Sequence, residues 1–264
     1  MGPAEIVSMA SGCGLRTIAL TDHDTMAGTA EMMEAGEKNG IEVIPGLELS
    51  VVFQGTSLHL LGYLVDEQEE CLQEGLRKIQ RERNERNRKI IEKLVNLGLS
   101  VSMDELQKAS GHGQAGRPHI AAMLIDHGVV KTMNQAFQHY LRKGRCAYSA
   151  RTEFKLETAM ELIKGAGGVA VLAHPGQMKG SLATLEALIR KLVVLGLDGV
   201  ELHYPTHSSS YKKKLGKLTE KYDLIHTGGS DYHGTIRAGT SLGVELSGEP
   251  GEEIIQGIKR KQKG

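Results

Sequence analysis

Short apolar runs that end in polar residues and lead into helical patterns recur along the chain, and this alternation constrains the fold more than any other feature. Each run is brief enough to be a strand buried on both faces. An alternation of strands and helices indicates an α/β fold whose parallel strands end at one common edge. We therefore expect a (β/α) barrel, with a doubly wound open sheet as the alternative. The runs lie at 17–20, 41–44, 169–173, 199–202 and 224–227.

The region from about 67 to 150 breaks this alternation. Apolar residues from Leu72 to Leu97 recur at helical spacing among many charges, which indicates a long amphipathic helix, and shorter helical patterns follow it. We therefore predict a barrel domain at 1–66 and 151–264, with an inserted helical subdomain at 67–150. Seven basic residues lie between Arg77 and Lys89; they form either a solvated helix face or a guide for a polyanionic ligand.

Composition excludes several functional classes. Lysine plus arginine equals aspartate plus glutamate at 32 each, so no global field would draw the chain to nucleic acid or to anionic membrane. Three widely spaced cysteines without a CxxC pair argue against a disulfide framework and fit a reducing cytoplasm. No apolar run approaches the roughly 20 residues that span a bilayer. We expect a cytoplasmic protein without a membrane association or a stable protein partner.

Metal-ligating side chains follow the predicted strands, at the edge where barrel enzymes collect their reactive groups. Four imidazoles and two carboxylates supply the nitrogen and oxygen ligands that zinc, manganese and iron accept. The acids that flank His23, Asp22 and Asp24, either orient an imidazole or are plain loop acids. The six candidate metal ligands are His23, Glu48, His59, His174, Asp231 and His233.

This ligand set suits the hydrolysis of phosphate esters. A carboxylate such as Glu48 can bridge two cations roughly 3.5–4 Å apart. One cation would lower the pKa of a water towards ~7 and so provide hydroxide, and the other would hold the phosphate oxygens. We expect two or three divalent ions, of Mn, Zn or Fe, with His23, His174, Asp231 and His233 as the catalytic residues.

The order of these motifs resembles the PHP (polymerase and histidinol phosphatase) family of metal-dependent phosphoesterases. The resemblance implies a distorted (β/α)7 barrel with an inserted helical subdomain. The insertion, with Gly116-Arg117-Pro118-His119 and the stretch 137–148, is similar to the bacterial branch that dephosphorylates 3′,5′-nucleoside bisphosphates and trims short RNA from its 5′ end. The motifs are Thr21-Asp22-His23-Asp24-Thr25, Gly46-Leu47-Glu48, His59 with Leu61-Gly62-Tyr63, Ala173-His174-Pro175, and Gly229-Ser230-Asp231-Tyr232-His233.

The resemblance also implies how the ions would be held. One ion would lie between Glu48, His59 and His174; a second would use His23 and His233 with an acidic residue upstream; a third would use Glu48 and Asp231 with two histidines of an HxH motif. Arg117 and His119 would face a phosphorylated nucleotide or short RNA, because arginine offers a bidentate fork to phosphate. His207 is a further candidate contact with the substrate, or lies only near the rim.

The family places its HxH pair on a first strand, and this sequence opens at Met1-Gly2-Pro3 without it. We therefore expect that the first strand is missing and that the ion cluster is incomplete, through either truncation or genuine loss. The leading hypothesis is a hydrolase of 3′,5′-nucleoside bisphosphates or short oligoribonucleotides. The alternatives are a non-catalytic module that binds metal or nucleotide, and a phosphatase of small molecules similar to histidinol phosphatase.

Overall fold

The computed structural model describes residues 1–110, 113–150, 153–178, 180–234, 239–244, 246 and 251–263. Its contacts divide the chain into two compact units. We call Met1–Gly75 with Phe154–Gly264 the sheet unit, and Leu76–Glu153 the helical unit. The boundaries fall between residues 75 and 76 and between residues 153 and 154. The sequence predicted them between residues 66 and 67 and between residues 150 and 151. The first boundary lies inside the long helix α3 (Glu70–Asn96).

The sheet unit is built on a seven-stranded sheet in the order β1-β2-β3-β5-β6-β7, with β4 paired to β2. β3 runs antiparallel to both of its neighbours, β2 and β5, and the other strand pairs are parallel. The α/β fold predicted from the sequence is confirmed, and the sheet is mixed because of the antiparallel strand β3. The strands are β1 (Thr17–Leu20), β2 (Glu42–Phe53), β3 (Thr56–Tyr63), β4 (Phe154–Lys155), β5 (Val169–Leu172), β6 (Gly199–His203) and β7 (Ile225–Gly228).

Strand β2 passes through Pro45 and Gly46, although a proline usually interrupts a strand. Pro45 is the last residue of β2 that pairs with β1, and Gly46 is the first that pairs with β3. A proline lacks the N–H that a strand ladder uses, so it is tolerated where the pairing changes. Gly46 is also required by packing, since a Cβ there would lie 2.7 Å from the carbonyl oxygen of Gly62.

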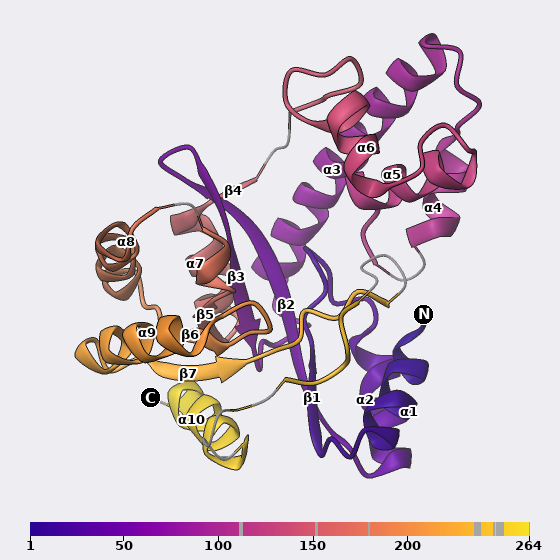
Figure 1. The fold of residues 1–264 in the computed structure, drawn as a ribbon. Helices are drawn as coiled ribbons and strands as arrows, with labels where there is room; N and C mark the ends of the chain where they lie inside the picture. The colour runs from indigo at the N-terminus through magenta and orange to yellow at the C-terminus, as the bar shows by residue number, and fades with distance from the viewer. Residues whose placement is uncertain are drawn as a thin grey trace. The chain divides into compact units, whose positions relative to one another are not determined.

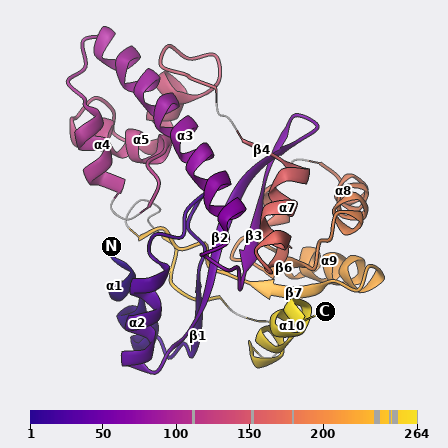
Figure 2. The same cartoon turned by 180° about the vertical axis from the view of Figure 1, so that it is seen from behind.

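Helices pack along the sheet from β2 to β7, as Figures 1 and 2 show. α7 contacts β2 and β5, α9 contacts β6 and β7, and α10 contacts β5 and β7. At the other end of the sheet, α1 and α2 pack on each other and α2 packs on β2. Among the described residues, the α-helices that lie wholly within the sheet unit are α1 (Pro3–Gly12), α2 (Thr29–Asn39), α7 (Leu156–Gly165), α8 (Leu182–Val194), α9 (Ser209–Lys221) and α10 (Gly251–Lys263).

Among the described residues, two apolar clusters help to hold the sheet unit together. One joins β3 and β5 to α10 through residues such as Leu61, Val171 and Ile258. The other fixes α1 and α2 against the β1 end through Val7, Leu20, Met32, Ala35 and Ile41. Burial of this apolar surface holds the strand ends at defined positions, which is what a site built from several strands requires.

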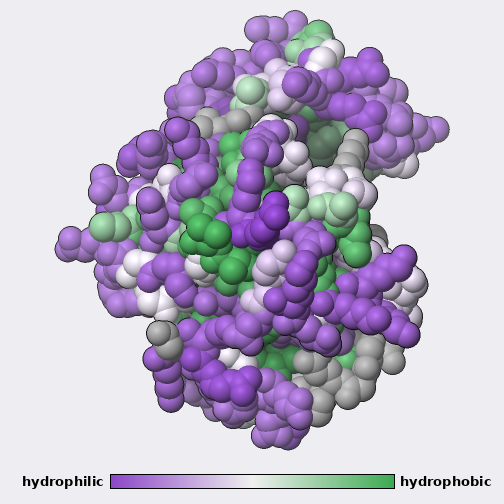
Figure 3. Space-filling view, turned by 90° about the vertical axis from the view of Figure 1, so that its left-hand side faces the viewer, coloured by the Kyte–Doolittle hydropathy of each residue, from purple (hydrophilic) through white to green (hydrophobic). Residues whose placement is uncertain are grey.

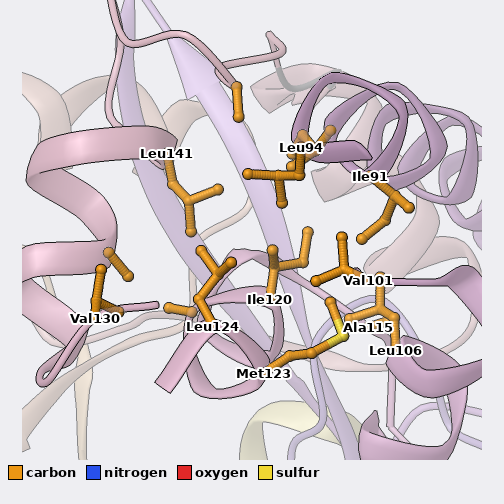
Figure 4. Packing of buried hydrophobic residues seen from close by; sticks show 14 residues of the cluster. Ile91, Leu94, Val101, Leu106, Ala115, Ile120, Met123, Leu124, Val130 and Leu141 are labelled. Carbon is orange, nitrogen blue, oxygen red and sulfur yellow. The ribbon is translucent and has the colours of Figure 1, made fainter. Parts of the chain in front are cut away.

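The helical unit has a core of its own. Figure 4 shows side chains from α3, α5 and the segments that follow converging on one another. Ile120 and Leu124 lie on one face of α5 and are fully buried, together with Leu94 of α3. The helices are the C-terminal part of α3, α4 (Met103–Ser110), α5 (Arg117–Asp126), α6 (Met133–Ala136) and the π-helix η1 (Phe137–Leu141).

The face drawn in Figure 3 is mostly hydrophilic, with smaller hydrophobic areas between the polar side chains. Among the described residues, no helix combines the length and the apolar character needed to cross a lipid bilayer.

Candidate metal centre

Glu48 is the central residue of the candidate site. It lies in β2, is 5% exposed, and its backbone exchanges hydrogen bonds with the segment after β1: its N–H donates to the Asp22 carbonyl and its carbonyl accepts from the Asp24 N–H, both at 3.0 Å. This bridge extends the pairing of β1 and β2 beyond the end of β1 and brings His23 opposite Glu48. The buried Glu48 carboxylate is thereby fixed beside the segment that follows the C-terminal end of β1.

Three imidazoles surround the Glu48 carboxylate. Its Oε2 lies 3.3 Å from Nδ1 of His23, and its Oε1 lies 2.6 Å from Nδ1 of His59 and 3.1 Å from Nε2 of His174. The last two nitrogens are 3.3 Å apart. His59 lies on β3 opposite Ser50, two residues from Glu48 on β2, so their side chains share one face of the sheet. His174 follows β5, the other neighbour of β3.

The spacing of these donor atoms fits a metal ion. Two ligands at about 2.1 Å from one ion in tetrahedral geometry lie roughly 3.4 Å apart. The distances of 3.1 to 3.3 Å match this value, and the 2.6 Å contact between Glu48 and His59 is shorter. His23, Glu48 and His59 also form a group whose donor atoms all lie within 4.8 Å of one another. The set of imidazole nitrogens and carboxylate oxygens suits zinc, manganese or iron.

The electrostatics of Glu48 favour a cation. Its burial raises its pKa, but the neighbouring His23 and His59, with hydrogen bonds from His174 and His59, hold this pKa well below the ordinary value. Burial lowers the pKa of His174, and the hydrogen bond and charge of Glu48 outweigh this effect, so the pKa of His174 is raised. An ionised carboxylate at this depth needs positive charge beside it.

Asp231 and His233 extend the cluster from the end of β7. The His233 ring centroid lies 6.0 Å from that of His23. Asp231 Oδ1 lies 3.3 Å from Nδ1 of His233, and Asp231 Oδ2 accepts a hydrogen bond of 2.9 Å from the Tyr204 hydroxyl. The structure therefore brings His23, Glu48, His59 and His174 into direct contact, with His233 and Asp231 beside them.

Asp24 stabilises the backbone next to the candidate ligands through a buried hydrogen bond. It is fully buried, and its Oδ1 accepts a hydrogen bond of 3.0 Å from the backbone N–H of Ser50. Its φ of 55° lies in the left-handed region, which Asp and Asn tolerate better than most residues. This bond ties the segment that carries His23 to the strand that carries Glu48.

Replacement of Asp24 by Ala should destabilise the protein by about 1–3 kcal/mol, because the buried N–H of Ser50 would lose its acceptor. Asp24→Asn keeps an oxygen at the same place and tolerates the positive φ, so its effect should be smaller. Urea denaturation followed by circular dichroism measures both changes. Equal losses in the two variants would show that the bond to Ser50 contributes nothing.

Comparison with known proteins places this geometry in a family. The family model described as PHP domain matches residues 1–192. The chain belongs to the PHP domain family. It is 32% identical over 242 residues to the 3′,5′-nucleoside bisphosphate phosphatase of Chromobacterium violaceum, covering 91% of this chain and 85% of that protein. It is also 32% identical over 245 residues to the 5′-3′ exoribonuclease of Haemophilus influenzae, covering 92% of this chain and 89% of the relative.

A solved structure from Bifidobacterium adolescentis, described as a metal-dependent phosphoesterase, superposes on the PHP chain with a TM-score of 0.86 at 27% identity. The superposition covers 98% of this chain and 91% of the other. The likeness therefore extends over both units. The family resemblance read from the sequence motifs is confirmed.

The predicted substrate residues of this PHP chain have defined local roles. Arg117 and His119 begin α5 in the helical unit, and Nδ1 of His119 accepts a hydrogen bond of 3.2 Å from the Gly116 N–H, which caps the helix. His207 is 6% exposed. Its Nδ1 donates to the Leu202 carbonyl and its Nε2 accepts from the Gly176 N–H, both at 3.0 Å. Both ring nitrogens of His207 therefore bond to backbone groups, and a contact between His207 and the substrate stays a prediction.

Two residues near the ligands were missed by the sequence analysis. Glu201 lies in β6, is 4% exposed, and its Oε2 accepts a hydrogen bond of 2.7 Å from the backbone N–H of His174. Burial raises the pKa of Glu201 to about 8. Tyr204 follows β6 and bonds to Asp231. A carboxylate in the middle of a short apolar strand, between two strands that end in candidate ligands, was the signal that could have found Glu201.

Proposed function

We propose that this chain is a metal-dependent hydrolase of phosphate esters that acts on 3′,5′-nucleoside bisphosphates or short oligoribonucleotides. The observation that carries the proposal is the buried Glu48 carboxylate with three imidazole nitrogens at 2.6–3.3 Å. The substrate class is supported by the relatives, which are named as a bisphosphate phosphatase and as a 5′-3′ exoribonuclease. We propose a cytoplasmic location, as for an enzyme of nucleotide and RNA turnover.

The six candidate ligands would hold two or three divalent ions. Glu48, His59 and His174 would hold one divalent ion, with His23, Asp231 and His233 as ligands for one or two more. When bound, such ions lower the pKa of a coordinated water and offset the negative charge of the phosphate oxygens. Manganese and zinc are the first candidates because the donor set mixes nitrogen and oxygen.

The chain itself would orient the reactants. Glu48 contributes a fixed negative charge, because its low pKa keeps it ionised. The imidazoles of His23 and His233 are less buried than His174, with side-chain exposures of 31% and 33% against 12%, so they form the part of the cluster that a substrate can approach. Arg117 and His119 of the helical unit would bind the substrate, Arg117 through a bidentate contact with phosphate.

Metal removal tests this proposal. Dialysis against a chelator should reduce phosphate release from adenosine 3′,5′-bisphosphate to background, and added Mn²⁺ should restore it, because no side chain of the cluster replaces the ion as a Lewis acid. The assay also includes a 5′-phosphorylated RNA trimer and histidinol phosphate. Preference for histidinol phosphate would replace the proposed substrate class, and the release of no phosphate from any substrate, with metal bound, would favour a binding module.

A further inference from the structure

Strand β6 lies between the two strands whose ends carry His174 and Asp231. It pairs in parallel with β5 on one side and β7 on the other. His174 and Asp231 both have positive φ values, of 27° and 49°. A residue other than glycine in this region costs about 1–3 kcal/mol, and persists only where its surroundings hold it. Something in the structure must therefore fix both ligands in place.

Glu201 of β6 holds the His174 loop. Its Oε2 accepts the backbone N–H of His174 at 2.7 Å, in a position that is 4% exposed. The same carboxylate fits closely against the loop that carries Asp231, because a Cβ on Gly229 would lie 2.7 Å from Oε1. The absence of a side chain at Gly229 lets this loop approach Glu201. One buried carboxyl group thus bonds to the His174 loop and lies close to the Asp231 loop.

Tyr204, the residue after β6, connects the same two loops. Its hydroxyl donates a 2.9 Å hydrogen bond to Oδ2 of Asp231 and accepts one from Nε2 of Gln177, which lies in the loop after His174. Its ring lies beside that of His174, with centroids 5.5 Å apart. A bond between a phenol and a carboxylate is a charge-assisted hydrogen bond, and here it sets the direction of the Asp231 side chain.

We propose that Glu201 and Tyr204 are positioning residues that hold His174 and Asp231 in the geometry for metal binding. This inference rests on the proposed function, since it takes these two residues as ligands. Neither Glu201 nor Tyr204 need touch the metal or the substrate. Partners that orient metal ligands typically change metal affinity or activity by about 10–100-fold when they are removed.

Tyr204→Phe removes the hydroxyl and keeps the ring. It should weaken Mn²⁺ binding by about 10-fold or more, measured by titrating the metal-free full chain and following free Mn²⁺ by electron paramagnetic resonance. Tyr211→Phe is the matched control: Tyr211 packs on His207 with centroids 4.9 Å apart, and its variant should bind Mn²⁺ as the wild type does. The Co²⁺-substituted protein gives a second readout, since an altered visible spectrum reports a change in ligand geometry.

Two Glu201 variants carry the test if Tyr204→Phe fails to fold. Glu201→Gln keeps an oxygen that can accept the His174 N–H, and should retain most of the Mn²⁺ affinity. Glu201→Ala removes the acceptor, and should lower the affinity by about 10–100-fold. Wild-type Mn²⁺ affinity in Tyr204→Phe and Glu201→Ala would overturn the proposal. A wild-type chain that binds Mn²⁺ but releases no phosphate would instead overturn the proposed function, and the affinities of the variants would still decide the positioning role.

Discussion

Glu48→Gln should lower kcat/KM for phosphate release by about 10³-fold, equivalent to about 4 kcal/mol of transition-state stabilisation. The substitution hardly changes the volume of the side chain but removes the charge that three imidazoles surround. A neutral amide cannot bridge two cations, and its N–H groups would face nitrogen atoms that must be free to bind metal. The loss should appear in kcat/KM and in the metal content of the purified protein together.

Glu34→Gln provides the control for this experiment. Glu34 lies on the exposed face of α2 and pairs with Lys38 at 2.6 Å, so its variant undergoes the same chemical change away from the cluster. It should retain wild-type activity and metal content. Glu48→Gln with full metal content and full activity would remove Glu48 from the metal centre. An intermediate case, with metal retained and activity lost, would identify Glu48 as a residue that tunes the ions rather than one that is needed to hold them.

The sequence predicted that the main members of this candidate cluster lie together, because of a simple property of parallel strands. Strands that run in the same direction end at the same edge, so polar residues after β1, β5 and β7 were expected to meet. His23, His174 and Asp231 lie at these three ends. The sequence could not give the distances between them, since these depend on sheet twist and on the left-handed conformations of His174 and Asp231.

Other features depended on tertiary contacts that no local pattern encodes. A proline usually interrupts a strand ladder, yet β2 continues through Pro45 because its pairing partner changes from β1 to β3 at that point. Glu201 looked like an ordinary acid in a short strand, and its importance appears only where the His174 backbone meets it. The sequence did not show that two backbone groups bond to the ring nitrogens of His207. In each case the contact partner is distant in sequence or set by the loop conformation.

The packing of side chains in the helical unit could likewise not be predicted from local sequence patterns. Apolar residues at helical spacing predicted the helix that contains Leu94, but not that Leu94 meets Ile120 and Leu124 in one buried cluster (Figure 4). The packing of these side chains determines how much stability the unit has, since protein interiors are filled to the density of organic crystals. A cavity in this cluster is therefore expected to have a large effect.

Leu124→Ala should destabilise the helical unit by about 2–5 kcal/mol, because it removes buried methyl and methylene groups and leaves a cavity that the surrounding side chains fill only in part. Leu124 is fully buried, whereas Leu97 of the same unit is 50% exposed, so Leu97→Ala makes the same chemical change at little cost. Hydrogen exchange followed by mass spectrometry distinguishes the two units. Peptides from Leu76–Glu153, the helical unit, should lose protection in Leu124→Ala and keep it in Leu97→Ala. Equal protection in the two variants would mean that the cluster around Leu124 does not limit the stability of the unit.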